Sequence, residues 1–292
     1  MSTTTIESHQ REFFGHPAGL FVLFFTEMWE RFSYYGMRAI LVLYLVSKTG
    51  GDNGGLGWTN GEALALYGWY TMMVYVMSVP GGYIADKFLG QKKSVLIGGV
   101  LLLIGHSVLA VEHMWAFYSG LVFIVLGVGM LKPNISTMVG GLYKKGDIRR
   151  DKGFTIFYIG INLGAFLSSL IVGYVGEVYG WHYGFGLAGI GMAFGVTQYY
   201  FGQKYLTHVG NYLGDTAESS VVMKAPLTKI EKDRVVVLLI SFLLVILFWG
   251  AFEQAGGLMN IYTMDKTDRM LGDWMVPASW FQSINAMFII FF

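Results

Sequence analysis

Long apolar runs, separated by short polar segments, fill most of the sequence. A membrane core about 30 Å thick requires roughly 20 apolar residues of helix. Seven complete runs meet this requirement: residues 17–47, 62–86, 92–112, 115–139, 153–176, 182–203 and 235–264. An eighth begins near Ser279 and is still apolar at Phe292, so we expect a fragment that stops within a helix. The pattern predicts an all-α membrane protein with several spans.

Basic residues are divided unevenly between the polar segments. The segments after the second, fourth and sixth runs hold thirteen Lys and Arg residues, whereas those on the other side hold only Lys48, Lys266 and Arg269. Because cytoplasmic loops carry the excess of Lys and Arg, the N-terminus and the basic segments are predicted to be cytoplasmic. The first sixteen residues are polar and contain no signal-peptide pattern. We therefore predict a multi-pass protein of the plasma (inner) membrane.

The longest polar stretch, residues 204–234, predicts a division of the chain into two helical bundles. Residues 1–16 would form a cytoplasmic tail and residues 17–203 an N-terminal six-helix bundle. Residues 204–234 would form a cytoplasmic linker, and residues 235–292 the start of a second bundle. This order is typical of two-bundle secondary transporters.

Composition supports the membrane assignment and excludes other classes. Only 13% of the 292 residues are charged, whereas soluble domains carry about 25%. The net charge of +1 gives no basis for a nucleic-acid partner, and the absence of Cys excludes disulfides and Cys-ligated metals. The His residues show no metal-ligand spacing, and no Ser–His–Asp arrangement occurs. We therefore expect neither an enzyme nor a bound metal or organic cofactor.

Six ionisable residues lie inside the predicted spans, where each costs about 2.5–3.5 kcal/mol at a helix centre. They are Glu27, Glu30, Arg31, Arg38, Lys132 and Glu253. Three acids and three bases indicate pairing within the bundle or around a wet cavity. At about 100° per residue, the charges of the first span share one side of the helix with Tyr34 and Tyr35. In the seventh span, Trp249, Glu253 and Asn260 likewise fall on one face.

Two readings of these charges follow from their chemistry. Structural ion pairs would hold the helices together. Alternatively, a carboxylate whose cationic partner moves away loads a proton, because the cation favours the ionised form and poor solvation favours the protonated form. The convergence of six groups from three spans favours proton coupling. Next to Lys132, Pro133 predicts either an ordinary kink or helix carbonyls opened toward a cavity.

Several segments are together similar to one family. Residues 27–36 (EMWERFSYYG) resemble the ExxERFxYYG motif of the proton-dependent oligopeptide transporters, within the major facilitator superfamily. Residues 81–90 (GGYIADKFLG) resemble the signature after the family's second helix, with Gly82, Asp86 and Gly90 at its motif positions. Residues 131–134 (LKPN), 154–166 (FTIFYIGINLGAF), 248–254 (FWGAFEQ) and 281–285 (FQSIN) resemble its helix 4, 5, 7 and 8 elements. The resemblance covers almost the whole chain.

The resemblance implies a fold, a function and site residues. The fold would be that of the major facilitators, with H⁺ as the coupling ion, di- and tripeptides as substrates and a monomer as the transport unit. Arg38 would pair with Glu253 as an outer gate. The proton-coupling residues would be Glu27, Glu30, Arg31, Lys132 and Glu253. The peptide-binding residues would be Tyr34, Tyr35, Arg38, Tyr75, Lys132, Asn162, Trp249 and Asn285.

The chain also departs from the family pattern. Gly68 stands where animal members have a histidine, and the family's acid for the peptide amino group lies in a tenth helix, beyond Phe292. The 204–234 segment is too short for the two extra helices that many bacterial members insert. Two alternatives stay open. Arg38 and Lys132 would also suit a carrier of nitrate or another small anion, and a receptor or scaffold without transport is the alternative from another class.

Overall fold

The computed structural model describes residues 11–51, 53–212 and 227–292, which are mostly helical. The helices are α1 (Ala18–Val46), α2 (Asn60–Val76), α3 (Ser78–Ile84), α4 (Gln91–Leu109), α5 (Met114–Gly141), α6 (Arg149–Val178), α7 (Trp181–Gly202), α8 (Lys229–Phe252), α9 (Leu258–Lys266) and α10 (Ser283–Phe291). Shorter turns are a π-helical turn (Ala85–Leu89) and 3-10 turns at Gln203–Tyr205, Glu253–Ala255 and Ala278–Gln282. Two small antiparallel hairpins pair β1 (Glu12–Phe13) with β2 (His16–Pro17), and β3 (Met270–Leu271) with β4 (Trp274–Met275). The predicted all-α class is confirmed.

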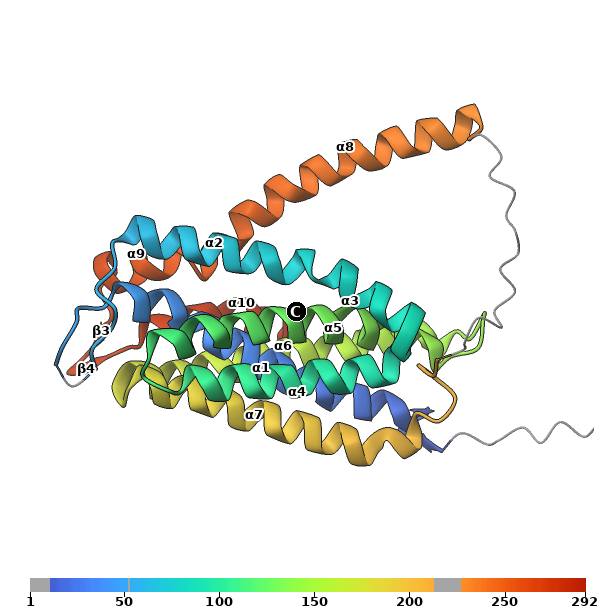
Figure 1. Cartoon of the computed structure of the whole chain (residues 1–292), viewed down its shortest axis with the longest axis horizontal. Coiled ribbons are helices and arrows are strands. Elements are labelled where there is room, and N and C mark those ends of the chain that lie inside the picture. Colours follow the sequence, from blue (N-terminus) through green and yellow to red (C-terminus); the bar gives the residue numbers. More distant parts are fainter. Residues whose placement is uncertain (1–10, 52, 213–226) are drawn as a thin grey trace, which may run out of the picture.

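Helices α1 to α7 form an elongated bundle in which the chain reverses at two ends (Figure 1). The basic end holds the hairpin β1–β2, the turn 85–90, the loop 142–148 and the segment 203–212. The far end holds residues 47–51 and 53–59, the turns 110–113 and 179–180, and the hairpin β3–β4. Helix α1 packs against α6 and α7, while α4 packs against α5 and α7. The charged helix therefore lies inside the bundle.

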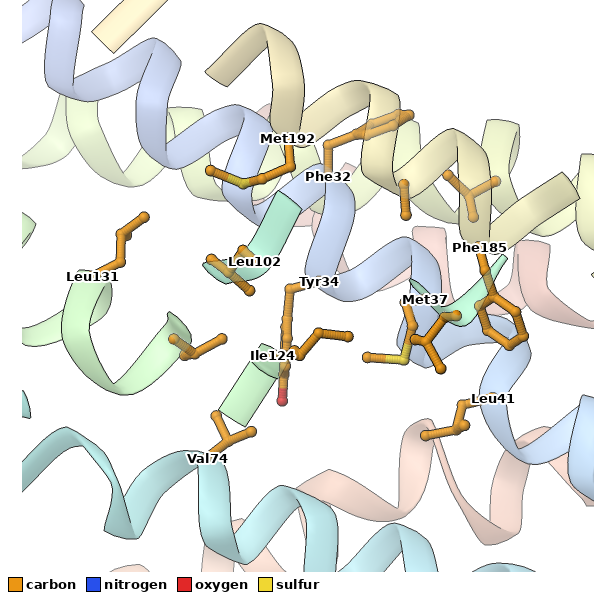
Figure 2. Close-up of a cluster of buried hydrophobic side chains, with 14 of the residues drawn as sticks. Phe32, Tyr34, Met37, Leu41, Val74, Leu102, Ile124, Leu131, Phe185 and Met192 are labelled. Atoms are coloured by element: carbon orange, nitrogen blue, oxygen red, sulfur yellow. The ribbon is translucent and has the colours of Figure 1, made fainter. Parts of the chain in front are cut away.

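The core around α1 is built from apolar side chains of several helices. Met37 of α1, Phe185 and Met192 of α7 belong to this buried cluster (Figure 2). Helix α6 approaches α1 closely because it presents glycine at the contact. A Cβ atom at Gly160 would lie 2.8 Å from the Phe24 ring. Small residues at such contacts let membrane helices approach closely.

The predicted second span, 62–86, is not one continuous helix. Helix α2 starts after Thr59, which forms a capping box with Glu62. It ends at Val76, and α3 begins at Ser78. Pro80 accounts for the interruption, because it has no N–H to donate to the Val76 carbonyl and its ring crowds that carbonyl. The prediction of a single helix was wrong because it overlooked this proline.

The predicted seventh span, 235–264, is also interrupted. Helix α8 ends at Phe252, a 3-10 turn follows, and α9 begins at Leu258 after Gly256 and Gly257. The prediction that Trp249, Glu253 and Asn260 share one helical face is therefore wrong. Asn260 instead lies on α9, where its Nδ2 donates to the Ala39 carbonyl of α1 at 2.8 Å. The break lets α9 cross the far end of α1.

Four stretches of the described chain are both long and apolar enough to span a membrane: Gln91–Leu109, Met114–Gly141, Arg149–Val178 and Lys229–Lys266. The other predicted spans also contain helix, but α1 carries four charges and α2 is interrupted. The predicted domain limits stay a prediction. Residues 1–10 of the predicted tail and 213–226 of the predicted linker lie outside the described residues, and α8 begins within the linker range at Lys229.

Polar contacts fasten the N-terminal hairpin to the basic end. Arg149 donates from Nη1 to Glu12 at 2.7 Å and from Nη2 to Asp147 at 3.0 Å. The hydrogen bonds from Arg149 hold the pKa of the Asp147 carboxyl below its usual range. His16 Nδ1 lies 2.8 Å from the Tyr143 hydroxyl. These contacts fix the start of α1 relative to α6.

Candidate functional site

Two glutamates of α1 share one guanidinium group. Arg31 Nε lies 2.9 Å from Glu27 Oε1 and 2.5 Å from Glu30 Oε2. The three side chains are at most 3% exposed. Although the charges are close, neither Glu30 oxygen receives a well-directed hydrogen bond from any described residue. Helical periodicity correctly placed this cluster on one side of α1. Because the cluster is buried, water does not screen its charges, and their sum affects its stability.

The cluster carries one more negative than positive charge when both carboxylates are ionised. Two carboxylates and one guanidinium leave a net charge of −1, which a buried site tolerates poorly. Lys132 was expected to contact this cluster, but in the described chain its Nζ makes no ion pair and lies 4.5 Å from the Tyr75 ring centroid. Either Lys132 or a proton would neutralise the excess charge.

An ion pair joins α1 to the end of α8. Arg38 Nη1 lies 2.7 Å from Glu253 Oε2, and the two side chains are 8% and 14% exposed. The Tyr75 hydroxyl donates to Glu253 Oε1 at 3.2 Å, and the Tyr67 hydroxyl donates to the Glu253 carbonyl at 3.2 Å. The structure thus brings together the two residues of the predicted gate. Its role as a gate stays a prediction.

Sequence reasoning missed Tyr67. A signal was present, because Tyr67, Tyr70 and Val74 have i, i+3, i+7 spacing and all three are buried on α2. Tyr70 in turn stacks on Tyr34 of α1, with ring centroids 6.5 Å apart. This face of α2 therefore supports the charged side of α1.

A cavity of about 160 Å³ lies between α1, α6, the end of α8 and α10. Four of the predicted peptide-binding residues line it: Tyr35, Arg38, Asn162 and Asn285. Ser169 and Gln282 also line it and were not predicted. Its lining combines Arg38 and neutral hydrogen-bonding groups with apolar side chains such as Ile161 and Phe252, so it suits a small solute that has both polar and apolar groups.

The other predicted peptide-binding residues lie around this cavity rather than in its wall. Tyr34 is buried against Tyr70, while Tyr75 and Lys132 contact each other. Trp249 is 44% exposed on α8 and packs against Phe248 and Phe252. Helix α8 has no buried residue and diverges from α2 toward the basic end (Figure 1).

The loop motif at the basic end has one residue with a clear structural requirement. Gly90 has φ of +76°, and a Cβ there would lie 2.5 Å from the Tyr212 nitrogen. The first turn of α4 also contacts the segment 203–212, because the backbone N–H of Lys92 donates to the Gly210 carbonyl at 2.8 Å. Asp86 is exposed in the π-helical turn, and Gly82 has open space around it.

The described residues contain no group of three or more His, Asp or Glu side chains arranged for a metal ion. The site instead consists of buried charges beside a cavity lined by polar and apolar side chains. Helices α1 and α6 and residues 252–286 form the walls of this cavity. Apolar helices with this interior and this order are typical of a multi-span secondary transporter, in agreement with the resemblance to the major facilitators.

Comparison with known proteins narrows the class. A sequence profile described as the POT family matches residues 92–224. The chain is 37% identical to the peptide transporter YePEPT of Yersinia enterocolitica over 352 aligned residues, which cover 99% of this chain and 68% of the relative. It is 38% identical to an uncharacterized transporter, YclF, of Bacillus subtilis, with 97% and 67% covered. The chain belongs to the POT family.

Two further likenesses agree with this membership. A di-/tripeptide transporter of Lactococcus lactis is 50% identical over 195 residues, 66% of this chain and 39% of the relative. A crystal structure of a peptide transporter POT in complex with sulfate superposes with a TM-score of 0.81 at 37% identity, covering 96% of this chain and 68% of that one. The chain thus spans about two thirds of the length of several relatives. The alignments of 333 and 352 residues exceed its 292 residues, so those relatives contain residues without a counterpart here.

Proposed function

We propose that this protein is a proton-coupled symporter that imports di- and tripeptides by alternating access. The observation that carries the proposal is the buried cluster of Glu27, Arg31 and Glu30, with its excess negative charge, beside a cavity lined by polar and apolar side chains. The family supplies the substrate class, because two relatives are named peptide transporters and one a di-/tripeptide transporter.

Charge balance suggests how proton and peptide binding are coupled. With Lys132 close to the cluster, two acids and two bases sum to zero. When Lys132 binds the carboxylate of a peptide, the cluster retains its net charge of −1, and a proton on Glu30 neutralises it. Peptide and proton therefore bind together more favourably than either binds alone. Arg38 also lines the cavity, and its N–H groups that are not bound to Glu253 offer further donors for the peptide carboxylate.

The contacts between the two parts of the chain support alternating access. Arg38 binds Glu253, Asn260 binds the Ala39 carbonyl, and both contacts lie toward the far end. Toward the basic end, α8 diverges from the bundle (Figure 1). With the basic end in the cytoplasm, this arrangement corresponds to a cavity closed to the outside of the cell. The proposed location is the plasma (inner) membrane, with a monomeric transport unit.

Uptake into liposomes tests the function. The full-length protein is reconstituted, and labelled dialanine uptake is measured with and without an inward-directed proton gradient. The gradient should stimulate uptake, and a protonophore should remove the stimulation. Nitrate uptake without gradient-stimulated dipeptide uptake would instead identify a small-anion carrier.

A second measurement separates a symporter from a receptor or scaffold. Peptide binding by the detergent-solubilised protein is compared with uptake for Glu30→Gln and Lys132→Ala. In a symporter these variants lose proton-driven uptake. If the protein is a receptor, the wild-type protein binds peptide but does not accumulate it in liposomes, and both variants still bind peptide.

A further inference from the structure

Glu177, near the C-terminal end of α6, caps a helix that belongs to residues 227–292. We call these residues the C-terminal part and residues 11–212 the N-terminal part. The helical stretch Ala278–Phe291 follows Pro277, which has no N–H to donate. Its first two amides are both bound by Glu177: Ala278 N donates to Oε2 at 2.9 Å and Ser279 N to Oε1 at 2.8 Å. A carboxylate there also interacts favourably with the positive end of the helix dipole.

Neighbouring contacts bring the same two segments together at the far end. The Trp280 indole donates to the Leu170 carbonyl of α6 at 2.9 Å. Gly173 of α6 contacts Ser279 so closely that a side chain at this position would overlap the serine hydroxyl. Helix α6 is therefore shaped to receive the start of the 278–291 helix.

Arg269 adds a positive charge to this contact. Its Nη1 donates to the Val276 carbonyl at 2.6 Å and lies 3.9 Å from Glu177 Oε2. Arg269 thus links the hairpin β3–β4 to the capped helix. The Glu177 and Arg269 side chains are only 14% and 12% exposed.

Among the described residues, the partners of the Glu177 carboxylate all come from the C-terminal part, residues 227–292. Separation of the N-terminal and C-terminal parts would therefore return the carboxylate and both helix amides to water. Glu177 does not line the 160 Å³ cavity, whereas Arg38 does. Its contacts consequently depend on closure of the far end and not on direct contact with substrate.

We propose that Glu177 is a second gate residue, which stabilises the closed far end independently of Arg38 and Glu253. This inference rests on the alternating-access cycle proposed above. Release of the 278–291 helix from Glu177 accompanies opening of the cavity toward the far end, and its recapture accompanies closure.

Spin-label distances across the far end test the proposal. The chain has no cysteine, so Lys48→Cys and Asp273→Cys place two labels on exposed positions of the opposing parts. In this background, Glu177→Ala should raise the ratio of long to short distances about a hundredfold, since two charge-assisted hydrogen bonds are lost. Glu177→Gln keeps one acceptor and should give an intermediate ratio. Glu112→Ala, which alters an exposed acid at the same end, should leave the distances unchanged.

Unchanged distances in a monodisperse Glu177→Ala protein would overturn the proposal, as would an equal shift in Glu112→Ala. If Glu177→Ala does not fold, the Glu177→Gln distances decide in the same way. The measurement uses neither peptide nor a proton gradient. Failure of peptide uptake therefore overturns the proposed substrate or coupling, while unchanged distances overturn the role of Glu177.

Discussion

At the scale of single residues, burial makes the number of charges matter as much as their distances. Arg31 contacts both Glu27 and Glu30, yet one guanidinium cannot neutralise two carboxylates. In water the remaining charge would cost little, but in a poorly solvated helix bundle it favours uptake of a proton or a second cation. The proposed coupling therefore depends on a single unbalanced charge.

Glu30→Gln should separate proton coupling from peptide binding. Glutamine imitates the protonated acid but cannot release a proton, so we expect gradient-stimulated uptake to fall at least about tenfold while peptide exchange without a gradient continues. Liposome uptake and counterflow measure the two activities. Glu112→Gln is the control, and persistence of full stimulation in Glu30→Gln would contradict proton binding at this residue.

Helical periodicity was sufficient to place Glu27, Arg31 and Arg38 together, because the spacing along one helix determines which face a residue occupies. It could not show that Lys132 contacts Tyr75. A long, flexible side chain selects its partner from the space left between α2 and α5, and that space depends on tertiary packing. Tyr67 was missed for a related reason, since its partner Glu253 comes from a distant part of the chain.

At the scale of elements, hydrophobicity identified the spans but not their interruptions. A run of apolar residues looks the same whether the helix within it continues or breaks. Pro80 and the pair Gly256–Gly257 were the local signals for the breaks in the second and seventh spans. The conformation that follows a break is set by packing: α3 lies against α5, and α9 contacts α1.

Gly81→Ala should destabilise the contact between α3 and α5. A Cβ at Gly81 would overlap the Gly129 carbonyl, approaching its carbon to 2.5 Å. Neither backbone yields easily, so we expect a loss of about 2 kcal/mol or more in the free energy of unfolding. Gly82→Ala is the matched control, because the space around Gly82 is open and alanine is the better helix former. Thermal unfolding in detergent compares the two, and equal stability would refute the close contact.

Gly256→Ala should disturb the ion pair between α1 and α8. A Cβ at Gly256 would lie 2.5 Å from the Tyr67 hydroxyl and 3.1 Å from Arg38 Nε. Tyr67 or Arg38 must then move away from Glu253, so we expect the initial rate of peptide uptake to fall about tenfold, the equivalent of one lost charged hydrogen bond. Gly250→Ala meets no atom within 4 Å and should transport normally. Equal rates for the two variants would show that this turn tolerates displacement.

At the scale of the whole molecule, sequence predicted the class of fold well because the bilayer restricts the chain to helices of a minimum length. The sequence did not predict whether the N-terminal and C-terminal parts close against each other at the basic end or at the far end. That property depends on a small free-energy difference between alternative packings of the same helices, and no local pattern records it. Only the three-dimensional structure showed that Glu253 and Asn260 contact α1 and that Glu177 contacts the helix that begins at Ala278.

Orientation in the membrane is the last property that the charge distribution predicts. Lys145 lies in the exposed loop between α5 and α6 at the basic end, and Lys48 is exposed at the far end. Because the chain lacks cysteine, Lys145→Cys and Lys48→Cys provide unique thiols. A membrane-impermeant thiol reagent applied to intact cells should label Lys48→Cys at once and Lys145→Cys only after the membrane is permeabilised. The opposite pattern would place the basic end outside the cell, and the end closed by Arg38 and Glu253 would then face the cytoplasm.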